Sequence, residues 1–167
     1  PSPGRAPSLM ALNLKPHPEG GFFRETYRSE EGIQEEALPE GYSGPRNFST
    51  AIYYLLTPGP CSRMHRLASD EVFHYYLGDP VTWLLLHPGG KVERIVMGSL
   101  LEKGHRLQVV IPAGTWFGGA LDDRGMFALM GTTVAPGFDT DDFILGNREE
   151  LLKGWPTCEN EIVKLTP

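Results

Sequence analysis

Residues 63–78 hold the side chains of this sequence that are best suited to chemistry, namely His65 and Glu71. A histidine near a carboxylate in a partly dry interior can act as a general base, because the carboxylate fixes the imidazole tautomer and raises its basicity. Neutral imidazole and carboxylate are also ligands of transition metals. A divalent transition metal held by His65 and Glu71 is therefore the alternative to a metal-free acid–base pair.

Strand alternation predicts which neighbours share the interior with this pair. Arg63 falls on the face of His65, where it would capture an anionic group of a ligand or form a stabilising ion pair. Tyr75 falls on the face of Glu71. His74 falls on the opposite face, unless a β-bulge reverses the parity.

Further candidates for ligand contacts lie in other predicted strands. Tyr53 is, with Tyr75, a candidate acid, and a core position is the alternative for either tyrosine. Trp116 would stack on a sugar or a base at a barrel mouth, or cover the core. His17 is expected to shape a turn. The remaining candidate ligand-binding residues are Phe23, Glu25, Ser49 and Gln108.

Short apolar runs separated by glycine and proline surround these residues and predict eight to ten strands with little helix. A strand over residues 19–28 opens with a flexible glycine pair, and residues 29–46 form an exposed loop. Asn147 caps a short helix over residues 148–153. The later strands are predicted at 48–56, 63–67, 71–77, 81–86, 91–97, 106–111, from 116 onward, and 126–134. This pattern is typical of an all-β barrel or sandwich.

Length and composition favour a single domain, since 167 residues with 40% hydrophobic content fit one core. We divide the chain into a flexible lead with a short helix (1–18), a barrel domain (19–155) and a C-terminal tail (156–167). A net charge of -6 argues against a nucleic-acid surface. No apolar run reaches the length of a membrane span. Two cysteines predict reduced thiols and a cytoplasmic location.

Two motifs of the chain resemble those of the cupin barrels. His65, Glu71 and Gly78 have the spacing of the first cupin motif, but Leu67 stands where a second histidine belongs. Pro-Ala-Gly-Thr-Trp at residues 112–116 resembles the second motif, and Phe117 stands where its histidine is expected. The frame of a metal-binding barrel is thus present without two of its ligands.

The order of motifs is similar to that of the uncharacterised cupin 5 family over residues 10–155. It runs from His-Pro-Glu-Gly-Gly at 17–21 and Phe-Arg-Glu-Thr-Tyr-Arg at 23–28, through Ile-Tyr-Tyr-Leu-Leu at 52–56, to Pro-Gly-Phe at 136–138 and Asp-Phe at 142–143. The resemblance implies a cupin barrel (a double-stranded β-helix, or jelly roll) with short N- and C-terminal helices. It also implies a homodimer, in which the strand over residues 22–28 takes part.

The function implied by the resemblance is the binding of a small molecule, a carbohydrate or nucleotide-sugar-like compound. Metal-free cupin epimerases are similar in using a His–acid pair and a tyrosine, so we predict isomerase or epimerase chemistry without a cofactor. His65 would be the base, Glu71 its partner, and Tyr53 or Tyr75 the acid. The alternatives are a metal-dependent oxygenase or sugar isomerase, and a non-catalytic binding or storage cupin, which the apolar Leu67 and Phe117 favour.

Overall fold

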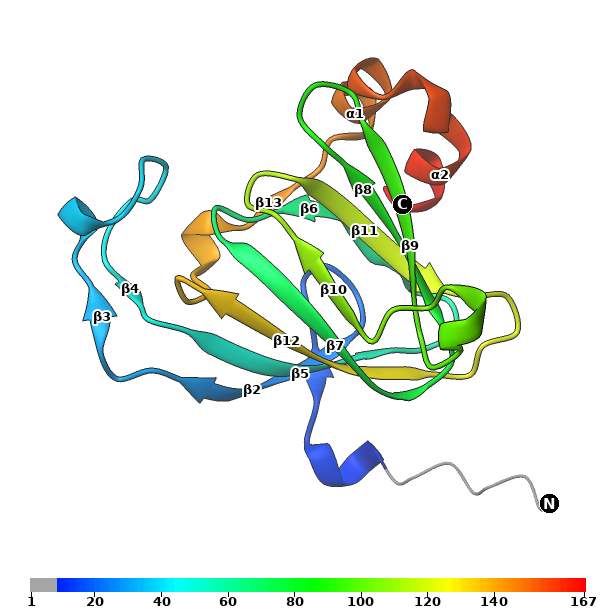
Figure 1. The fold of residues 1–167 in the computed structure, drawn as a ribbon, viewed down its shortest axis with the longest axis horizontal. Coiled ribbons are helices and arrows are strands. Elements are labelled where there is room, and N and C mark those ends of the chain that lie inside the picture. Colours follow the sequence, from blue (N-terminus) through cyan, green and yellow to red (C-terminus); the bar gives the residue numbers. More distant parts are fainter. Residues whose placement is uncertain (1–8) are drawn as a thin grey trace.

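The computed structural model of this chain describes residues 9–167 and consists mainly of two antiparallel sheets that face each other (Figure 1). The six-stranded sheet has the order β1 (Lys15–Pro16), β2 (Phe22–Arg28), β5 (Thr50–Leu56), β12 (Ala128–Ala135), β7 (Asp70–Gly78) and β10 (Gln108–Ile111). The five-stranded sheet has the order β13 (Ile144–Leu145), β6 (Ser62–Arg66), β11 (Trp116–Leu121), β8 (Val81–Leu86) and β9 (Val92–Met97). The predicted all-β barrel is confirmed, and the predicted strands agree with the observed ones to within a few residues.

The helices are short and lie at the two ends of the chain and in connections. α1 (Arg148–Gly154) and α2 (Glu159–Lys164) cover the outer face of the five-stranded sheet (Figure 1). The Asn147 side chain accepts a hydrogen bond from the backbone N–H of Glu150, as predicted for its cap. The 3₁₀ helices are η1 (Leu9–Leu12), η2 (Glu35–Ala37), η3 (Leu101–Lys103), η4 (Thr140–Asp142) and η5 (Pro156–Cys158).

Short helical segments lie near both ends of the described residues. The expected N-terminal helix is the 3₁₀ turn η1, and residues 1–8 of the predicted flexible lead lie outside the described residues. Residues 156–167, expected as a tail, contain η5 and α2, and Ile162 of α2 is fully buried. Among the described residues, no helix is long and apolar enough to cross a membrane.

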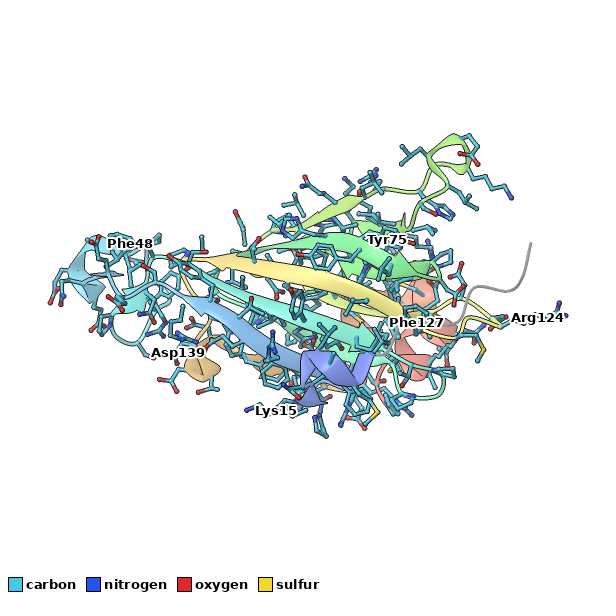
Figure 2. The ribbon with its side chains drawn as sticks, turned by 90° about the horizontal axis from the view of Figure 1, so that it is seen from below. Lys15, Phe48, Tyr75, Arg124, Phe127 and Asp139 are labelled. Carbon is cyan, nitrogen blue, oxygen red and sulfur yellow. The ribbon has the colours of Figure 1, made fainter. Side chains whose placement is uncertain are left out.

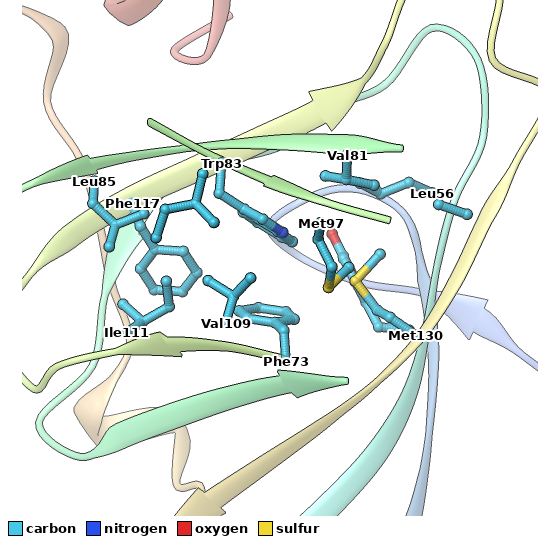
Figure 3. Packing of buried hydrophobic residues seen from close by; sticks show 13 residues of the cluster. Leu56, Phe73, Val81, Trp83, Leu85, Met97, Val109, Ile111, Phe117 and Met130 are labelled. Atoms are coloured by element: carbon cyan, nitrogen blue, oxygen red, sulfur yellow. The ribbon is translucent and has the colours of Figure 1, made fainter. Parts of the chain in front are cut away.

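Most of the space between the sheets is filled by one apolar cluster, to which strands of both sheets contribute (Figure 3). Phe73 of β7 packs against Trp83 of β8 with ring centroids 4.4 Å apart. Because strand side chains alternate between faces, Leu84 and Leu86 of β8 point the other way and pack against Leu151 of α1 and Ile162 of α2. The strand β8 is therefore buried on both faces.

Three irregularities in strand register change the faces that simple alternation predicts. In β6, Phe117 of β11 lies opposite His65 and Gly119 lies opposite Ser62, so two residues of β6 face one of β11 between these pairs. A second shift separates Glu25 from Tyr27 in β2, and Tyr27 is 55% exposed. The third lies between Leu129 and Met130 of β12.

The predicted loop at 29–46 carries a small ladder of β3 (Gly32–Ile33) and β4 (Arg46–Asn47), which extends away from the barrel (Figure 1). A buried ion pair ties its end to η4. The Arg46 guanidinium donates to both carboxylate oxygens of Asp142 at 2.9 and 2.8 Å, and both side chains are only 3% exposed. The pair fixes the segment beside the barrel opening.

Replacing Arg46 by Ala should lower the free energy of unfolding by about 3–5 kcal/mol, because the buried Asp142 carboxylate then lacks its partner. Urea denaturation measures the change. The matched control is Arg94→Ala, which removes an ion pair with Glu161 whose side chains are 51% and 38% exposed, and should cost less than about 1 kcal/mol. Equal losses in both variants would contradict the structural role of the Arg46 pair.

Candidate functional site

A cavity of about 340 Å³ lies between the sheets, at the end of the barrel that the apolar cluster leaves open. Its walls are largely apolar: Phe23, Ile52, Leu67, Phe73, Val134, Phe138 and Phe143. Its uncharged hydroxyls and its acid–base groups are Thr50, Thr132, His17, Glu19, His65 and Glu71. Charged residues of the β1–β2 edge complete the lining: Lys15, Arg24, Glu25 and Arg28.

Glu19 enters the cavity because two glycines let the chain pass very close to neighbouring strands. A Cβ atom on Gly20, at φ +108°, would lie 2.0 Å from the carbonyl oxygen of Cys61, and one on Gly21, at φ +76°, 2.7 Å from that of Leu55. The glycine pair, predicted from the sequence to be flexible, is required because the chain passes so close to its neighbours. The turn thereby fixes the position of Glu19.

Hydrogen bonds hold this turn from several sides. The Glu19 carbonyl accepts from the Arg63 backbone N–H at 2.7 Å, and the Glu19 N–H donates to Nδ1 of His17 at 3.0 Å. The Tyr54 hydroxyl donates to the Gly20 carbonyl at 2.6 Å. His17, predicted to shape the turn, does so and also lines the cavity.

His65 is hydrogen-bonded through both ring nitrogens. Nε2 lies 2.6 Å from Oε2 of Glu19, and Nδ1 lies 2.6 Å from the carbonyl oxygen of Arg63. Both partners are acceptors, so both nitrogens donate and the ring is an imidazolium. Its faces pack against Phe117, with centroids 4.1 Å apart, and Phe143, at 5.1 Å, and such aromatic faces stabilise a cation.

Glu71 and Thr132 present polar atoms that no described residue satisfies. Glu71 is only 6% exposed, and its Oε2 has no hydrogen-bond partner among residues 9–167. The hydroxyl of Thr132, on the neighbouring strand β12, is likewise buried without a partner. Unpaired buried polar groups are costly, so two of them in one cavity indicate a place for a polar atom of a ligand or for water.

The buried charges set the protonation of the site. Burial alone lowers the pKa of His65, but the charge and the hydrogen bond of Glu19 outweigh it and raise the pKa to about 9. Burial tends to raise the pKa of Glu19, whereas attraction to His65 brings it below its usual value. Burial raises the pKa of Glu71 to about 8, despite the opposing effect of His65. Near neutral pH the site therefore holds an ion pair beside a largely protonated carboxyl.

Four predicted site residues line this cavity, and the structure places the other seven elsewhere. Those in the lining are Phe23, Glu25, His65 and Glu71. The others are Arg63, Ser49, Tyr53, His74, Tyr75, Gln108 and Trp116. Arg63 lies outside because the bulge in β6 breaks the alternation that relates it to His65.

The outer face of the six-stranded sheet carries three of these residues. His74 pairs its Nε2 with the Thr133 hydroxyl at 2.9 Å, and Gln108 lies opposite His74. The predicted outward orientation of His74 is thus observed. Tyr53 packs edge-on against Tyr76 on this face, with ring centroids 6.2 Å apart.

The remaining three predicted site residues make packing or backbone contacts away from the cavity. Tyr75 packs against the apolar cluster and donates its hydroxyl to the Gly78 carbonyl at 2.7 Å. Trp116 joins the cluster under the C-terminal helices, beneath the Arg66 guanidinium. Ser49 immediately precedes β5, and its carbonyl accepts a hydrogen bond from the Ser29 N–H.

The donor set of the cavity does not fit a transition metal. Among residues 9–167, no group of three or more His, Cys, Asp or Glu side chains is arranged to hold one. Both nitrogens of His65 are already hydrogen-bonded within the protein. At the two motif positions without histidine, Leu67 forms part of the apolar wall and Phe117 packs on the His65 ring.

Comparison with known proteins identifies relatives over nearly the whole chain. The family described as Cupin superfamily (DUF985), Cupin_5, matches residues 8–146. The uncharacterized protein YML079W of Saccharomyces cerevisiae is 33% identical over 166 residues, which cover 92% of this chain and 82% of the yeast protein.

Solved structures agree with this assignment. A hypothetical protein from Leishmania major superposes with a TM-score of 0.84 at 31% identity, covering 94% of this chain and 95% of that one. Protein SO0799 from Shewanella oneidensis gives 0.82 at 36% identity, covering 93% and 92%. Oxalate decarboxylase from Bacillus subtilis gives 0.54 at 14% identity, covering 90% of this chain and 36% of the enzyme, a likeness of fold alone.

The raised pKa of Glu71 predicts a specific pH dependence of stability. In the unfolded protein Glu71 ionises above its ordinary pKa of 4.5, whereas in the folded protein it keeps its proton up to about pH 8. The free energy of unfolding therefore falls as the pH rises from 4.5 to about 8. His65 acts in the same direction between pH 6.5 and about 9, since the folded residue keeps its proton over this range while the unfolded residue loses it above 6.5.

Replacing Glu71 by Gln removes its part of this dependence. Relative to the wild type, the variant should gain a few kcal/mol of unfolding free energy between about pH 5 and about pH 9, measured by urea denaturation. Glu25→Gln, which removes a carboxylate that is 39% exposed from the same cavity, is the control and should show no such gain. A Glu71→Gln effect that is equal at both pH values would contradict the assignment of a protonated Glu71.

Proposed function

The chain belongs to the Cupin_5 family of the cupin superfamily, and we propose that it binds a small molecule in the cavity and moves a proton of that molecule through Glu71. The observation that carries the proposal is the buried Glu71 carboxyl, which faces the cavity without a protein partner. At about 340 Å³ the cavity is at the lower end of the range of small-molecule sites. Apolar walls with a few convergent polar groups are typical of such sites.

The ligand that we propose is a carbohydrate, with a sugar-sized part inside the cavity. Four phenylalanines of the lining offer surfaces for the C–H faces of a sugar ring: Phe23, Phe73, Phe138 and Phe143. The Thr132 hydroxyl and the Glu71 carboxyl can both bond to a carbonyl oxygen of the ligand. A complete nucleotide sugar would leave its nucleotide outside.

Glu71 is suited to isomerase or epimerase chemistry because a carboxyl with a pKa of about 8 exists in both forms near neutral pH. The ionised form accepts the proton from the carbon beside the ligand carbonyl. The C–H electron pair then forms an enolate, to which Thr132 donates a hydrogen bond. For an isomerisation, Glu71 then delivers this proton to the former carbonyl carbon, while the neighbouring hydroxyl passes its proton to the former carbonyl oxygen. The carbonyl thereby shifts by one carbon, and no proton is gained or lost overall.

His65 has a different place in this scheme from the base that the sequence predicts. Both of its nitrogens donate to protein acceptors, so proton abstraction by His65 requires one of these bonds to open. Its charge instead favours the ionised form of Glu71. We propose that His65 and Glu19 are positioning residues for the proton chemistry of Glu71.

A non-catalytic binding protein is the second candidate, and Leu67 favours it. This side chain places an apolar wall where metal cupins have a donor, which suits retention of a ligand as well as its conversion. Deuterium exchange at the ligand separates the two functions, since a binding protein leaves the ligand hydrogens in place.

We also propose a homodimer and a cytoplasmic location. Beyond the two residues of β1, the outer edge of β2 has no partner strand among residues 9–167, and such an edge suits pairing with a second copy. Cys61 and Cys158 are free buried thiols, as is usual for proteins of a reducing compartment.

Fructose 6-phosphate and a thymidine-diphospho-4-keto-hexose are suitable probes of the exchange reaction. In D₂O, the wild type should exchange the hydrogen beside the carbonyl, as measured by NMR, and Glu71→Gln should lower the rate by about 10²-fold or more. Thr132→Val should weaken binding, whereas Thr133→Val, on the outer face of the same strand, is the control and should leave binding unchanged. Exchange that survives in Glu71→Gln but disappears in a folded His65→Gln variant would assign the base to His65 instead.

A further inference from the structure

We infer that His17 binds an uncharged oxygen atom of the ligand through the N–H group at Nε2 of its ring. His17 is then a ligand-binding residue as well as a part of the turn at residues 17–21. This inference rests on the proposed function, because it adds a contact to the ligand of the same cavity and restricts the kind of atom that can lie there.

Backbone hydrogen bonds and an aromatic neighbour fix the position of His17. The residue directly follows β1, at the edge of the six-stranded sheet where Figure 2 labels Lys15. Its N–H donates to the Gly21 carbonyl at 2.9 Å, and its carbonyl accepts from the Gly20 N–H at 3.0 Å. The Phe23 ring, which also lines the cavity, packs edge-on against the imidazole with ring centroids 4.7 Å apart. These contacts hold the His17 ring at the wall of the cavity.

The hydrogen bond at Nδ1 determines the tautomer of His17. The Glu19 backbone N–H lies 3.0 Å from Nδ1, and since a backbone N–H can only donate, Nδ1 accepts and carries no proton. The Glu19 carboxylate is 3.9 Å from Nδ1, too far for a hydrogen bond. Burial lowers the pKa of His17, the Glu19 carboxylate opposes this effect, and the charge of His65 adds to it. The ring is therefore neutral near pH 7, with its proton on Nε2.

The Nε2–H group of His17 is free to bind a ligand. Among residues 9–167, the one hydrogen bond of the ring is at Nδ1, and the side chain lines the cavity although it is only 10% exposed. The N–H of a neutral imidazole donates, so the atom that binds it must be an acceptor. Hydroxyl and carbonyl oxygens of a carbohydrate meet this requirement, whereas an ammonium group does not.

The charges around His17 favour an uncharged oxygen at this place. Glu19, in the same turn, carries a negative charge that His65 already balances at 2.6 Å, so an anionic oxygen nearby would lack a cation of its own, which is costly. The Thr132 hydroxyl and the protonated Glu71 carboxyl are further donors in the lining. The interior therefore suits an uncharged group with several oxygen atoms, as in a sugar.

NMR of the wild type with ¹⁵N-labelled histidine tests the contact without a substitution. In the free protein, the His17 ring should carry its proton on Nε2. Saturation with fructose 6-phosphate or with the thymidine-diphospho-4-keto-hexose should shift the Nε2–H resonance and slow its exchange with water. A proton on Nδ1 in the free protein, or an Nε2–H resonance that does not respond to a bound probe, would overturn the inference.

Two substitutions separate ligand binding by His17 from its place in the turn. In His17→Asn, the side-chain oxygen can still accept from the Glu19 N–H, as in an Asx turn, but no donor remains at the position of Nε2. In His17→Gln, the longer amide brings an N–H donor near that position and gives up the bond within the turn. Calorimetry with fructose 6-phosphate should show binding about tenfold weaker in His17→Asn and at most about threefold weaker in His17→Gln. Urea denaturation should show the reverse order, with the larger loss of stability in His17→Gln.

The matched control is His105→Asn. Nδ1 of His105 likewise accepts from a backbone N–H, that of Leu100 at 3.2 Å, but His105 follows η3 and lies outside the cavity lining. This variant should bind the probe as the wild type does. Losses of affinity in His17→Asn and His17→Gln that follow their losses of stability would show that His17 serves the turn alone.

The outcomes separate this inference from the proposed function. If the probe binds and Glu71→Gln slows hydrogen exchange at the ligand, while Nε2–H of His17 does not respond, the proposed function stands and the contact with His17 is wrong. If neither probe binds to the wild type, the proposed function and the inference both fail.

Discussion

The structure depends on a charged pair, His65 and Glu19, enclosed between two β-sheets at 2.6 Å. Burial of two charges costs several kcal/mol per ion and is offset only where geometry is good and the remaining polar atoms are satisfied. Here the Arg63 carbonyl accepts from the second nitrogen of His65, and the glycine pair after Glu19 brings its turn against two neighbouring strands. These contacts hold the turn around Glu19 against the strand that carries His65, although the two segments are distant in the sequence.

The pair determines the chemistry of the surrounding cavity. Since Glu19 already balances His65, a second carboxylate has no cation of its own, and Glu71 keeps its proton to about pH 8. Phe117 takes a motif position at which metal cupins have a histidine, and there it packs on the imidazolium ring. The cupin frame thus remains, while two of its donor positions carry apolar side chains: Leu67 lines the cavity and Phe117 packs on His65.

The sequence predicts the fold well because alternation and turn residues report directly on strands, and the family motifs identify the barrel. It predicts the site only in part. His65 and Glu71 lie in one motif and are found, whereas Glu19 is missed, since its contact with His65 depends on pairing between distant segments. The Pro-Glu-Gly-Gly motif at residues 18–21 is the sequence signal that points to Glu19. Arg63 is misplaced by a bulge that alternation cannot reveal. Thr132 is missed because a lone threonine in a strand is usually part of the core.

The protonation of His65 tests this account most directly. Side-chain nitrogen NMR of selectively ¹⁵N-labelled protein at neutral pH reports whether each ring nitrogen carries a proton. We expect both His65 nitrogens to be protonated, and we expect the neutral ring to return in Glu19→Gln because its charged partner is gone. A neutral tautomer of His65 in the wild type, with one free nitrogen, would contradict the buried ion pair and with it the assignment of a protonated Glu71.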